Sequence, residues 1–310
     1  MADSSKSAGL MSRMLIHTAA KLYYIDGLSQ IEVARRMEIS TASVSRLLTR
    51  ARDGGFVRFE VPPLDDITGD DARLAQGLGL KQVRAVDAAH QPALAVAVGF
   101  LIAEAELPED PVVAIGWGRA VQGIVTHGLP ALPNARVVPA TGGMNQSQAH
   151  FQINEFARTI AEQMGGTAHL LYAPARPSPE LYAQLIRTPE IAAVSELWDR
   201  VDITVTGVGN FPDTSAEHAL GFNADQKARI KGDVVRQYFD KFGAPIDWPG
   251  QEAQMGMSRT QLSQVPLAIG VCVGGDKVDA IIGAARSGMI NALVTDTRTA
   301  KLVRKKLDVA

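Results

Sequence analysis

The sequence predicts an α/β protein with a small all-helical N-terminal part and a larger domain built on a mostly parallel sheet. Three observations predict this. Helical patterns separated by short polar turns occupy the first sixty residues. From about residue 70 onward, short apolar runs alternate with helical patterns, and several of those runs end in glycine. Apolar strands followed by helices are typical of a parallel sheet whose two faces are both covered.

Composition narrows the class of protein. The chain has 310 residues, of which 46% are apolar and 21% charged, and its single cysteine is Cys272. One thiol excludes internal disulfides and multi-thiolate zinc sites, and its apolar surroundings predict a small buried side chain. No apolar run reaches the roughly 18 residues of a membrane span, and no secretory signal opens the sequence. We therefore expect a cytoplasmic protein with no membrane partner.

Charge is unevenly distributed along the chain. Residues 1–60 hold 9 Lys and Arg against 6 Asp and Glu, whereas residues 61–310 hold 22 against 27. The overall charge of −2 therefore conceals a basic N-terminal part on an acidic remainder. A basic segment of this kind indicates contact with nucleic acid.

The N-terminal part predicts three helices in order. The first covers Met14–Ile25 and offers Leu15, Ala19 and Leu22 for packing. The second begins at Ser29, which forms a capping box with Glu32. Its apolar side carries Ile31, Val33, Ala34 and Met37. Glu38 follows, at a turn position where helix-turn-helix proteins often have glycine.

The third helix begins after Ser40 or Thr41, either of which can cap it, and Gly54-Gly55 ends it. One side forms an apolar stripe of Val44, Leu47, Leu48 and Ala51. Short hydroxyl side chains and arginines lie on the other side. Such a helix fits the major groove, with hydroxyls and N–H groups on phosphates and Arg46 on a base edge. The predicted DNA-binding residues are Ser29, Thr41, Ala42, Ser43, Ser45, Arg46, Thr49 and Arg50. The alternative is an ordinary helical hairpin with a solvated basic face.

A boundary follows this helical part. Phe56–Val61 alternates like a strand and predicts a small wing or link. Val61-Pro62-Pro63 then breaks any helix, and the polar stretch LDDITGDD favours turns. We therefore expect a DNA-binding domain over residues 1–60 and an effector-binding and oligomerisation domain over residues 61–310.

The larger domain alternates strand and helix patterns. The predicted strands are Gln82–Asp87, Val112–Gly116, Arg136–Ala140, Ala168–Tyr172, Asp202–Gly207, Leu267–Val273 and Asn291–Asp296. The predicted helices are Ala93–Glu106, Arg119–Gly128, Ile153–Met164, Pro179–Arg187, Glu190–Arg200, Lys277–Ser287 and Thr297–Lys306. Residues in the 220s to 260s follow neither pattern and receive no assignment.

Five loops that follow predicted strands in this domain are candidate ligand loops, and four of them are rich in glycine. They have the sequences GWGR, TGGMN, APAR, GVGN and GGDK, of which only APAR lacks glycine. Ligands of open α/β sheets bind beyond the carboxyl ends of the strands, so these loops predict a binding site. The alternative is that the glycines only make tight turns. Polar groups in or near these loops are Arg119, Asn145, Asp233 and Lys277. Lysine suits a phosphate, and Asp and Asn suit sugar hydroxyls, so the set indicates a sugar, polyol or sugar phosphate.

Other ligand classes lack their motifs. The segment GWGRAV has Val121 where a dinucleotide fingerprint needs glycine. The sequence contains no Walker A, G-x-S-x-G or H-E-x-x-H motif, and its six histidines lack metal-ligand spacing. We therefore expect no cofactor and no bound metal.

Several ordered segments resemble the SorC family of bacterial sugar-responsive transcriptional regulators. They include IEVARRMEISTASVSRLL, VVAIGWGRAV, RVVPATGGMN, GDVVRQYFDKFG and GVCVGGDKVDAIIGAARSGMI. The resemblance implies a helix-turn-helix domain and a Rossmann-like effector domain similar to phosphosugar isomerases. It also implies a homotetramer whose affinity for operator DNA changes when a carbohydrate binds.

The resemblance implies effector-binding residues position by position. The GWGR turn supplies Gly116, Trp117, Gly118 and Arg119, and the ATGG turn supplies Thr141, Gly142 and Gly143. Asp233 of GDV is implied to contact sugar hydroxyls, and Lys277 of GGDK to contact a phosphate or hydroxyl. Residues 146–148 add no second basic group, which leaves a neutral sugar and a phosphosugar equally supported.

Two other functions stay open beside the regulator. An isomerase or deaminase acting on sugar phosphates, with an added DNA-binding part, is the enzymatic alternative. Against it, no general base has a convincing partner in the sequence, and an enzyme has no use for the basic N-terminal part. A DNA-binding scaffold with a decayed sugar pocket is the third interpretation.

Overall fold

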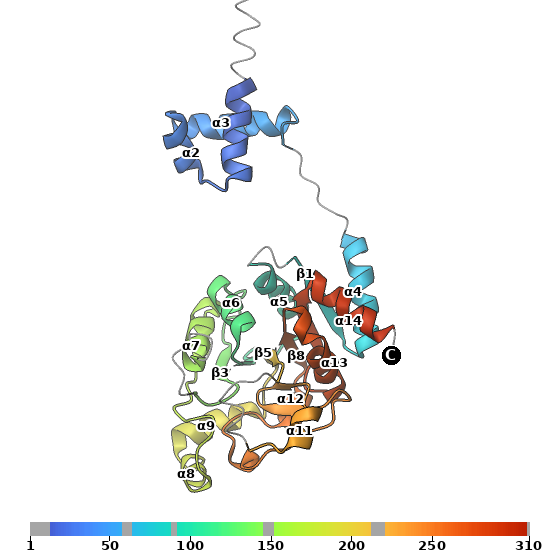
Figure 1. Ribbon diagram of the computed structural model, residues 1–310. Helices are drawn as coiled ribbons and strands as arrows, with labels where there is room; N and C mark the ends of the chain where they lie inside the picture. Colours follow the sequence, from blue (N-terminus) through green and yellow to red (C-terminus); the bar gives the residue numbers. More distant parts are fainter. Residues whose placement is uncertain (1–12, 58–63, 88–91, 145–151, 212–220, 309–310) are drawn as a thin grey trace, which may run out of the picture. The chain divides into compact units, whose positions relative to one another are not determined.

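The computed structural model describes residues 13–57, 64–87, 92–144, 152–211 and 221–308. The chain divides into two compact units, Met1–Leu64 and Asp65–Ala310, which we call the head and the body (Figure 1). The expected boundary at residues 60 and 61 lies outside the described residues. Each unit has its own core and is described by itself.

The head consists of three helical segments. A helix over residues 13–20 continues into a single π-helical turn, η1 (Lys21–Ile25), and is followed by α2 (Gln30–Met37) and α3 (Thr41–Asp53). Their shared core contains Ala19, Leu22, Val33, Ala34, Val44 and Leu48. The three predicted helices are therefore confirmed.

Two residues of the predicted head core do not lie in it. Ile31 is 64% exposed and Leu15 is 44% exposed. Ile31 stands in the first turn of α2, and its position on the helix carries it away from the Val33 and Ala34 side. The prediction that these two side chains pack inside the head was wrong.

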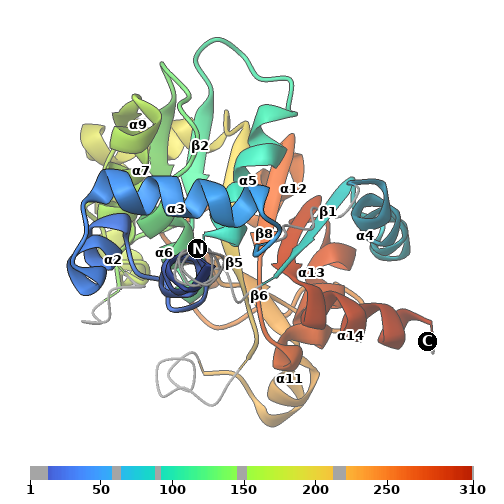
Figure 2. The same cartoon turned by 90° about the horizontal axis from the view of Figure 1, so that it is seen from above.

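A sheet of parallel strands organises the body. It contains β1 (Gln82–Val86), β2 (Val112–Ile115), β3 (Arg136–Pro139), β4 (Thr167–Ala168), β5 (Ile203–Gly209), β8 (Leu267–Val271) and β9 (Ala292–Asp296). Their order is β1-β9-β8-β5-β2-β3-β4, and all of these neighbours pair in parallel. Of these strands, β1, β8, β5 and β2 are labelled in Figure 2. The predicted parallel sheet is confirmed, although β4 is shorter than the strand expected over Ala168–Tyr172.

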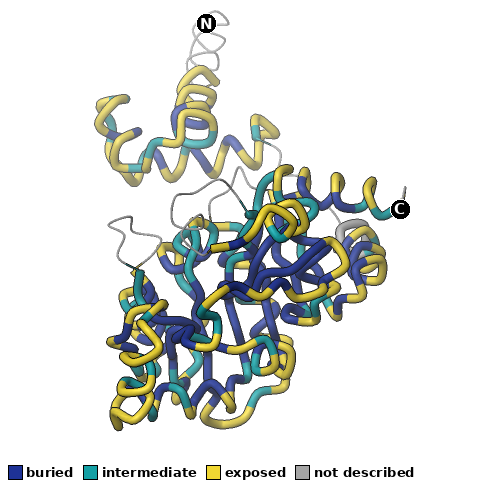
Figure 3. The backbone as a smooth tube through the Cα atoms, turned by 60° about the horizontal axis from the view of Figure 1, so that its bottom comes forward, coloured by how far each residue is buried: buried dark blue, intermediate teal, exposed yellow. Residues whose placement is uncertain are grey.

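Helices cover both faces of the sheet. Val113 and Ile115 of β2 pack with α5 (Ala93–Ala103), α6 (Arg119–His127) and α7 (Ile153–Met164) in one core cluster. Val112 and Ala114 belong to a second cluster on the opposite face, built with α9 (Pro189–Trp198), α13 (Val278–Ser287) and α14 (Thr297–Leu307). Successive strand residues therefore point into different cores, which explains why the strands are apolar throughout. Their interior position is visible as dark blue in Figure 3.

The remaining elements lie around this sandwich. They are α4 (Leu64–Leu78), α8 (Pro179–Leu185), α11 (Ala224–Arg229), β6 (Gly232–Val234), β7 (Gln237–Phe239), η3 (Gln251–Ala253), α12 (Arg259–Gln264) and η4 (Gly275–Lys277). All seven helices predicted for the body are present within a few residues of their expected bounds.

Helix α4 corrects the sequence analysis, which assigned turns to its first half. The helix begins directly after Pro62-Pro63 in the sequence and buries Leu74, Ala75 and Leu78 in the body core. Asp71 is also buried, and its carboxylate accepts a hydrogen bond from the N–H of Ala85, 3.1 Å away. Burial in the body core therefore stabilises a helix whose polar residues favour turns in isolation.

Only the first two residues of the strand predicted over Phe56–Val61 are described, and they are not in a strand. Phe56 and Val57 lie in a bend after α3, and residues 58–61 lie outside the described residues. The unassigned region in the 220s to 260s contains an antiparallel hairpin, in which β6 pairs with both β5 and β7.

Candidate functional site

The capping box at the start of α2 fixes Ser29. The N–H of Ser29 donates to Glu32 Oε2 at 2.8 Å, and the N–H of Glu32 donates to Ser29 Oγ at 3.3 Å. The Ser29 hydroxyl also donates to Glu32 Oε2, at 2.7 Å, and this bond and the one from the Ser29 N–H lower the pKa of Glu32. The structure therefore gives Ser29 a role in the helix start, and its contact with DNA stays a prediction.

The turn between α2 and α3 is tight because Glu38 adopts a left-handed conformation, with φ of 55°. Its N–H reaches the carbonyls of Ala34 and Arg35 and ends α2. Glycine adopts this conformation at no steric cost, which explains why glycine is common at such turns. Glu38 therefore adopts, as a non-glycine residue, a conformation that glycine adopts readily.

Helix α3 presents one polar side. Ser40 is its N-cap, because Ser40 Oγ accepts the N–H of Ser43 at 3.1 Å. Val44, Leu48 and Ala51 are buried as predicted, and Leu47 is half-buried. Of the predicted DNA-binding residues on this helix, Ser43 is half-buried and six are exposed: Thr41, Ala42, Ser45, Arg46, Thr49 and Arg50.

The arginines of this side have few competing partners. Arg46 donates to Ser43 Oγ at 3.3 Å, and Arg50 has no ion pair among the described residues. Guanidinium groups without acidic partners are available to phosphate oxygens or base edges. Their use in DNA binding stays a prediction.

In the body, the sheet has a topological switch point between β2 and β5. From β2 the chain proceeds to β3 and β4 on one side, and then returns to β5 on the other side. The loops that follow β2 and β5 meet there. A Cβ atom on Gly207 would lie 2.8 Å from the carbonyl oxygen of Trp117, and one on Gly116 would lie 3.0 Å from Thr206. Glycine at these two positions is therefore required by close packing of the loops.

Helix α6 begins at this edge. Gly118 has φ of 123°, a backbone conformation that other residues rarely adopt, and it leads directly into Arg119. The first N–H groups of an α-helix have no partner within the helix, so they face the switch point. The side chain of Arg119 is exposed.

The loop after β3 is held in place by its own backbone. Gly142 N–H donates to Met255 O and Gly143 N–H donates to Ala173 O, both at 2.8 Å. The buried hydroxyl of Thr141 also donates to Met255 O, at 3.1 Å. These groups are therefore occupied within the protein, and the loop shapes the edge rather than offering free donors. Asn145, predicted in the same loop, lies outside the described residues.

The β6–β7 hairpin extends this edge. Gly209 at the end of β5 pairs with Asp233 of β6, which places the carboxylate beyond the switch point. Asp233 is only 9% exposed, and its Oδ2 accepts the N–H of Arg236 at 2.9 Å. Burial raises the pKa of Asp233, although the positive charges of Arg236 and Lys277 oppose the rise.

Val235 and Arg236 form the two-residue turn of this hairpin. Both have positive φ, 52° and 61°, as a type I′ turn requires. The guanidinium of Arg236 lies 5.2 Å from the centre of the Trp117 ring. It also donates to Met144 Sδ at 3.4 Å. Arg236 was not among the predicted site residues, because Val-Arg lacks the Asn-Gly signature by which such turns are predicted.

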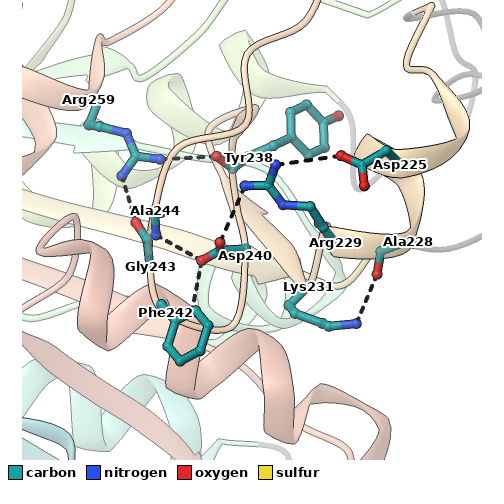
Figure 4. A network of polar contacts seen from close by, with 10 residues as sticks. All are labelled: Asp225, Ala228, Arg229, Lys231, Tyr238, Asp240, Phe242, Gly243, Ala244 and Arg259. Carbon is teal, nitrogen blue, oxygen red and sulfur yellow. Dashed lines mark hydrogen bonds and ion pairs between the residues drawn. The ribbon is translucent and has the colours of Figure 1, made fainter.

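A polar network around Asp240 holds the far end of the hairpin (Figure 4). Asp240 Oδ1 accepts the N–H groups of Phe242 and Ala244 at 2.8 and 3.0 Å, and Arg229 lies 3.6 Å from Asp240 Oδ2. Arg259 donates to the carbonyl of Tyr238 at 3.0 Å. Polar contacts along β7 and the loop that follows it therefore hold the end of the hairpin opposite the turn that carries Arg236.

The loop after β8 contributes Lys277. Its Nζ donates to Asn210 Oδ1 at 2.6 Å, and Asn210 Nδ2 donates to Asp276 Oδ2 at 2.9 Å. The preceding Gly274 has φ of 119°, and its N–H donates to Asp296 Oδ2 at 3.2 Å. Lys277 is half-buried, and its positive charge is close enough to lower the pKa of Asp233. Cys272, at the end of β8, is buried as predicted.

The structure therefore brings Trp117, Asp233, Arg236 and Lys277 together at one edge of the sheet. Indole, carboxylate and cationic groups in one place suit a small ligand with hydroxyl groups. Among the described residues, no three His, Cys, Asp or Glu side chains are grouped as metal ligands. No helix in the described part of the chain is long and apolar enough to cross a membrane.

The two units define a class of protein: a regulator in which a small helical unit is joined to an α/β unit with a ligand site. The family model described as "Putative sugar-binding domain" matches residues 67–304. The chain belongs to this family, and specifically to the SorC family of sugar-binding transcriptional regulators.

Relatives match over nearly the whole chain. The sorbitol operon regulator of Klebsiella pneumoniae is 28% identical, over 94% of this chain and 98% of that protein. The transcriptional regulator LsrR of Enterobacter sp. (strain 638) is 26% identical, over 98% and 97%. The deoxyribonucleoside regulator of Bacillus subtilis (strain 168) is 25% identical, over 91% and 95%.

Solved structures agree with these matches. The full-length sorbitol operon regulator SorC from Klebsiella pneumoniae has a TM-score of 0.72 and 25% identity, covering 94% of this chain and 98% of that one. A probable sor operon regulator from Shigella flexneri has a TM-score of 0.67 and 25% identity, covering 77% and 99%. The relatives are named as transcriptional regulators, which supports the regulator prediction and not the isomerase or deaminase alternative.

Proposed function

We propose that the protein binds operator DNA through a helix-turn-helix formed by α2 and α3, and that a carbohydrate bound to the body controls this affinity. The DNA-binding half rests on one observation: the side of α3 opposite its buried stripe exposes hydroxyls and two arginines that have no acidic partner among the described residues. In the proposed complex Arg46 reads a base edge, and the exposed hydroxyls and Arg50 contact phosphates.

The effector half rests on the convergence of Asp233, Trp117 and Lys277 at the switch point of the sheet. Asp233 accepts hydrogen bonds from sugar hydroxyls, and the indole of Trp117 offers an apolar face to a sugar ring. A relative with the same domain order is a sorbitol operon regulator, which favours a polyol, a sugar or a phosphate ester of either. The cytoplasm is the compartment in which such a regulator meets DNA.

The proposed regulator is a homo-oligomer, and by family resemblance a tetramer. Helix α5 supports self-association, because it is apolar on all sides yet leaves Val96 and Phe100 exposed at 53% and 59%. Exposed apolar side chains one helical turn apart form a face that a second subunit covers.

An Arg46→Ala variant tests the DNA-binding half. The DNA is a fragment that the wild-type protein selects from a random-sequence library. The variant is expected to lose about 1–3 kcal/mol of binding free energy, roughly 5- to 150-fold in affinity, at one base position. A mobility-shift titration at fixed salt measures the loss.

An Arg73→Ala variant is the matched control, because Arg73 is an exposed arginine of the body that pairs with Asp70. It is expected to bind the selected DNA as the wild type does. Full affinity and unchanged base preference in the Arg46→Ala variant would show that α3 is not the recognition helix.

A further inference from the structure

We propose that α14 carries a second DNA-contacting surface, in which Arg298, Lys301 and Lys305 bind phosphates of the duplex that flanks the operator. We call these three residues the basic stripe. The inference rests on the proposed function, because its partner is the DNA that the head is proposed to bind. It goes beyond that function by giving the body, which the sequence assigned to effector binding and oligomerisation, a part in DNA affinity.

The basic stripe lies along one side of a helix that the body core holds in place. Thr299, Ala300 and Val303 are buried, and the carboxylate of Asp296 accepts the N–H of Thr299 at 2.9 Å where the helix begins. The three residues of the stripe are exposed. Because they are three and four positions apart, they share one side of the helix, opposite the buried residues. The stripe therefore faces away from the core.

The body leaves the cations of the stripe without acidic partners. Helix α14 contains five Lys and Arg and no Asp or Glu. Two of the five are paired: Arg304 lies 2.8 Å from Asp70 on α4, and Lys306 pairs with Asp279 on α13. Within the described ranges, none of the three stripe cations has an ion pair. Their charges are therefore available to an external anion.

The stability of α14 does not account for the stripe. A cation near the C-terminus of a helix interacts favourably with the helix dipole, which suits Lys305. Arg298 is the second residue of the helix, where a cation opposes the dipole. Like charges three or four positions apart also repel each other, so the stripe destabilises the helix that carries it. An anionic partner that offsets this repulsion is therefore indicated.

The length and the sign of the stripe fit duplex DNA. From Arg298 to Lys305 the helix rises about 10 Å. One DNA strand places a phosphate about every 3.4 Å along the duplex axis, so the stripe is long enough to reach two or three phosphates. Residues 61–310 hold 27 acidic against 22 basic residues, and the stripe is a local exception to that balance. A basic stripe along a helix is typical of nucleic-acid contact.

The place of α14 in the body favours DNA over other polyanions. Helix α14 packs beside α4, where a Cβ atom on Gly77 would lie 3.3 Å from Leu307 Cδ1. Helix α4 is the first element of the body, so the chain that joins head and body enters it directly. Tethering of this kind raises the effective concentration of DNA at a second, weak site. An anionic membrane fits less well, because the exposed side of α14 adds only Leu302, at 39% exposure, as an apolar anchor.

The test replaces all three residues of the stripe by glutamine in the full chain. Glutamine favours helix, and the buried side of α14 is unchanged, so the variant is expected to fold, which thermal melting checks. A mobility-shift titration measures affinity for the library-selected DNA between about 50 and 200 mM salt. Loss of three phosphate contacts is expected to lower the slope of log affinity against log salt by about 2.7, so that this rise in salt weakens the wild type roughly 40-fold more than the variant. Base preference is expected to stay unchanged, unlike that of Arg46→Ala.

The matched control removes the same charge elsewhere on the body. It combines Arg187→Gln, Arg200→Gln and Lys227→Gln, three exposed cations that have no ion pair in the part of the chain that the structure describes. This triple variant is expected to keep the wild-type slope. In addition, extending the selected site by about one helical turn, roughly 10 base pairs, on each side is expected to strengthen binding by the wild type and the control but not by the stripe variant.

Equal slopes for the stripe variant and the wild type would overturn the inference. An equal loss of slope in the control would also overturn it, because net charge would then determine the affinity. Light scattering that shows a smaller assembly for the stripe variant would assign the stripe to a contact between subunits instead. An unchanged slope together with lost binding to phosphatidylglycerol vesicles would assign it to a membrane. A wild type that selects no DNA would refute the proposed function itself.

Discussion

At the scale of single residues, burial of the Asp233 carboxylate lowers the stability of the folded protein at neutral pH. Its pKa is raised by burial, so the folded protein holds this proton more tightly than the unfolded chain, whose value is near 3.8. Below that pH the carboxyl is neutral in both states. As the pH rises through the raised folded value, ionisation inside the protein removes stability. At neutral pH, Asp233 therefore lowers the stability of the effector-free protein.

An Asp233→Asn variant is expected to melt at a higher temperature than the wild type at pH 7 and to lose this advantage below about pH 4. Asn Oδ1 can still accept the N–H of Arg236, and no charge is buried. Calorimetric melting from pH 3.5 to 8 measures the difference. A lower melting temperature at pH 7 would show that attraction to Arg236 and Lys277 outweighs burial.

Asp296→Asn is the control with the opposite sign. Burial raises the pKa of Asp296, but hydrogen bonds from Thr299 and Gly274 lower it by more than burial raises it. The pKa of Asp296 is therefore below its usual value. Its stabilisation is present above the unfolded value near 3.8 and is lost as the pH falls through the folded value. This variant is therefore expected to be less stable than the wild type at pH 7.

Residues in turns were harder to predict than residues in helices. The capping box of Ser29 and Glu32 was predicted because both partners lie three positions apart in the sequence. The turn of Val235 and Arg236 was missed because neither residue favours positive φ on its own. Its conformation is imposed by the pairing of β6 with β5 and β7.

At the scale of elements, strands and helices with a strong period were predicted well, and elements that depend on distant contacts were not. Helix α7 has the bounds expected from its apolar spacing, Ile153–Met164. Helix α4 was interpreted as turns, because its stability comes from burial of Leu74 and Leu78 against the body. The spacing of apolar residues indicates which face of a segment is buried, but it does not show whether another element packs against that face.

Helix α5 carries the prediction on oligomerisation. A Phe100→Glu variant is expected to form a smaller assembly than the wild type, since a charge on the apolar face opposes its burial against a second subunit. Light scattering coupled to size-exclusion chromatography measures the mass of each. Phe242→Glu, at a phenylalanine outside α5 that is 66% exposed against 59% for Phe100, is expected to leave the assembly unchanged. Equal masses for Phe100→Glu and the wild type would exclude α5 as an interface.

At the scale of the whole molecule, two units with separate cores must communicate for a carbohydrate to control DNA binding. Such control is described by a coupling free energy between the two sites, and it is reciprocal. If the effector weakens DNA binding by some factor, DNA weakens the binding of the effector by the same factor. Typical couplings are about 1–3 kcal/mol, or roughly 5- to 150-fold.

We expect this reciprocity from the compound that releases DNA most strongly among sorbitol, sorbitol 6-phosphate and gluconate. Its dissociation constant is measured by calorimetry with and without the selected DNA, at one salt concentration. The two fold-changes are expected to agree. A compound that binds equally tightly in both conditions, while DNA affinity also stays constant, would show that the body does not control the head.

The sequence by itself determined the two-part organisation, the order of strands and helices in the body, the helical head and the family resemblance. These features depend on local spacing, on apolar period and on motifs that lie within a few residues of each other. Only the tertiary structure decided that the N–H groups of Gly142 and Gly143 are occupied and that Arg236 meets Trp117. Those contacts join residues about 30 to 120 positions apart, whereas sequence patterns of apolar and polar residues extend over only about 11 to 18 residues, so they cannot predict such contacts.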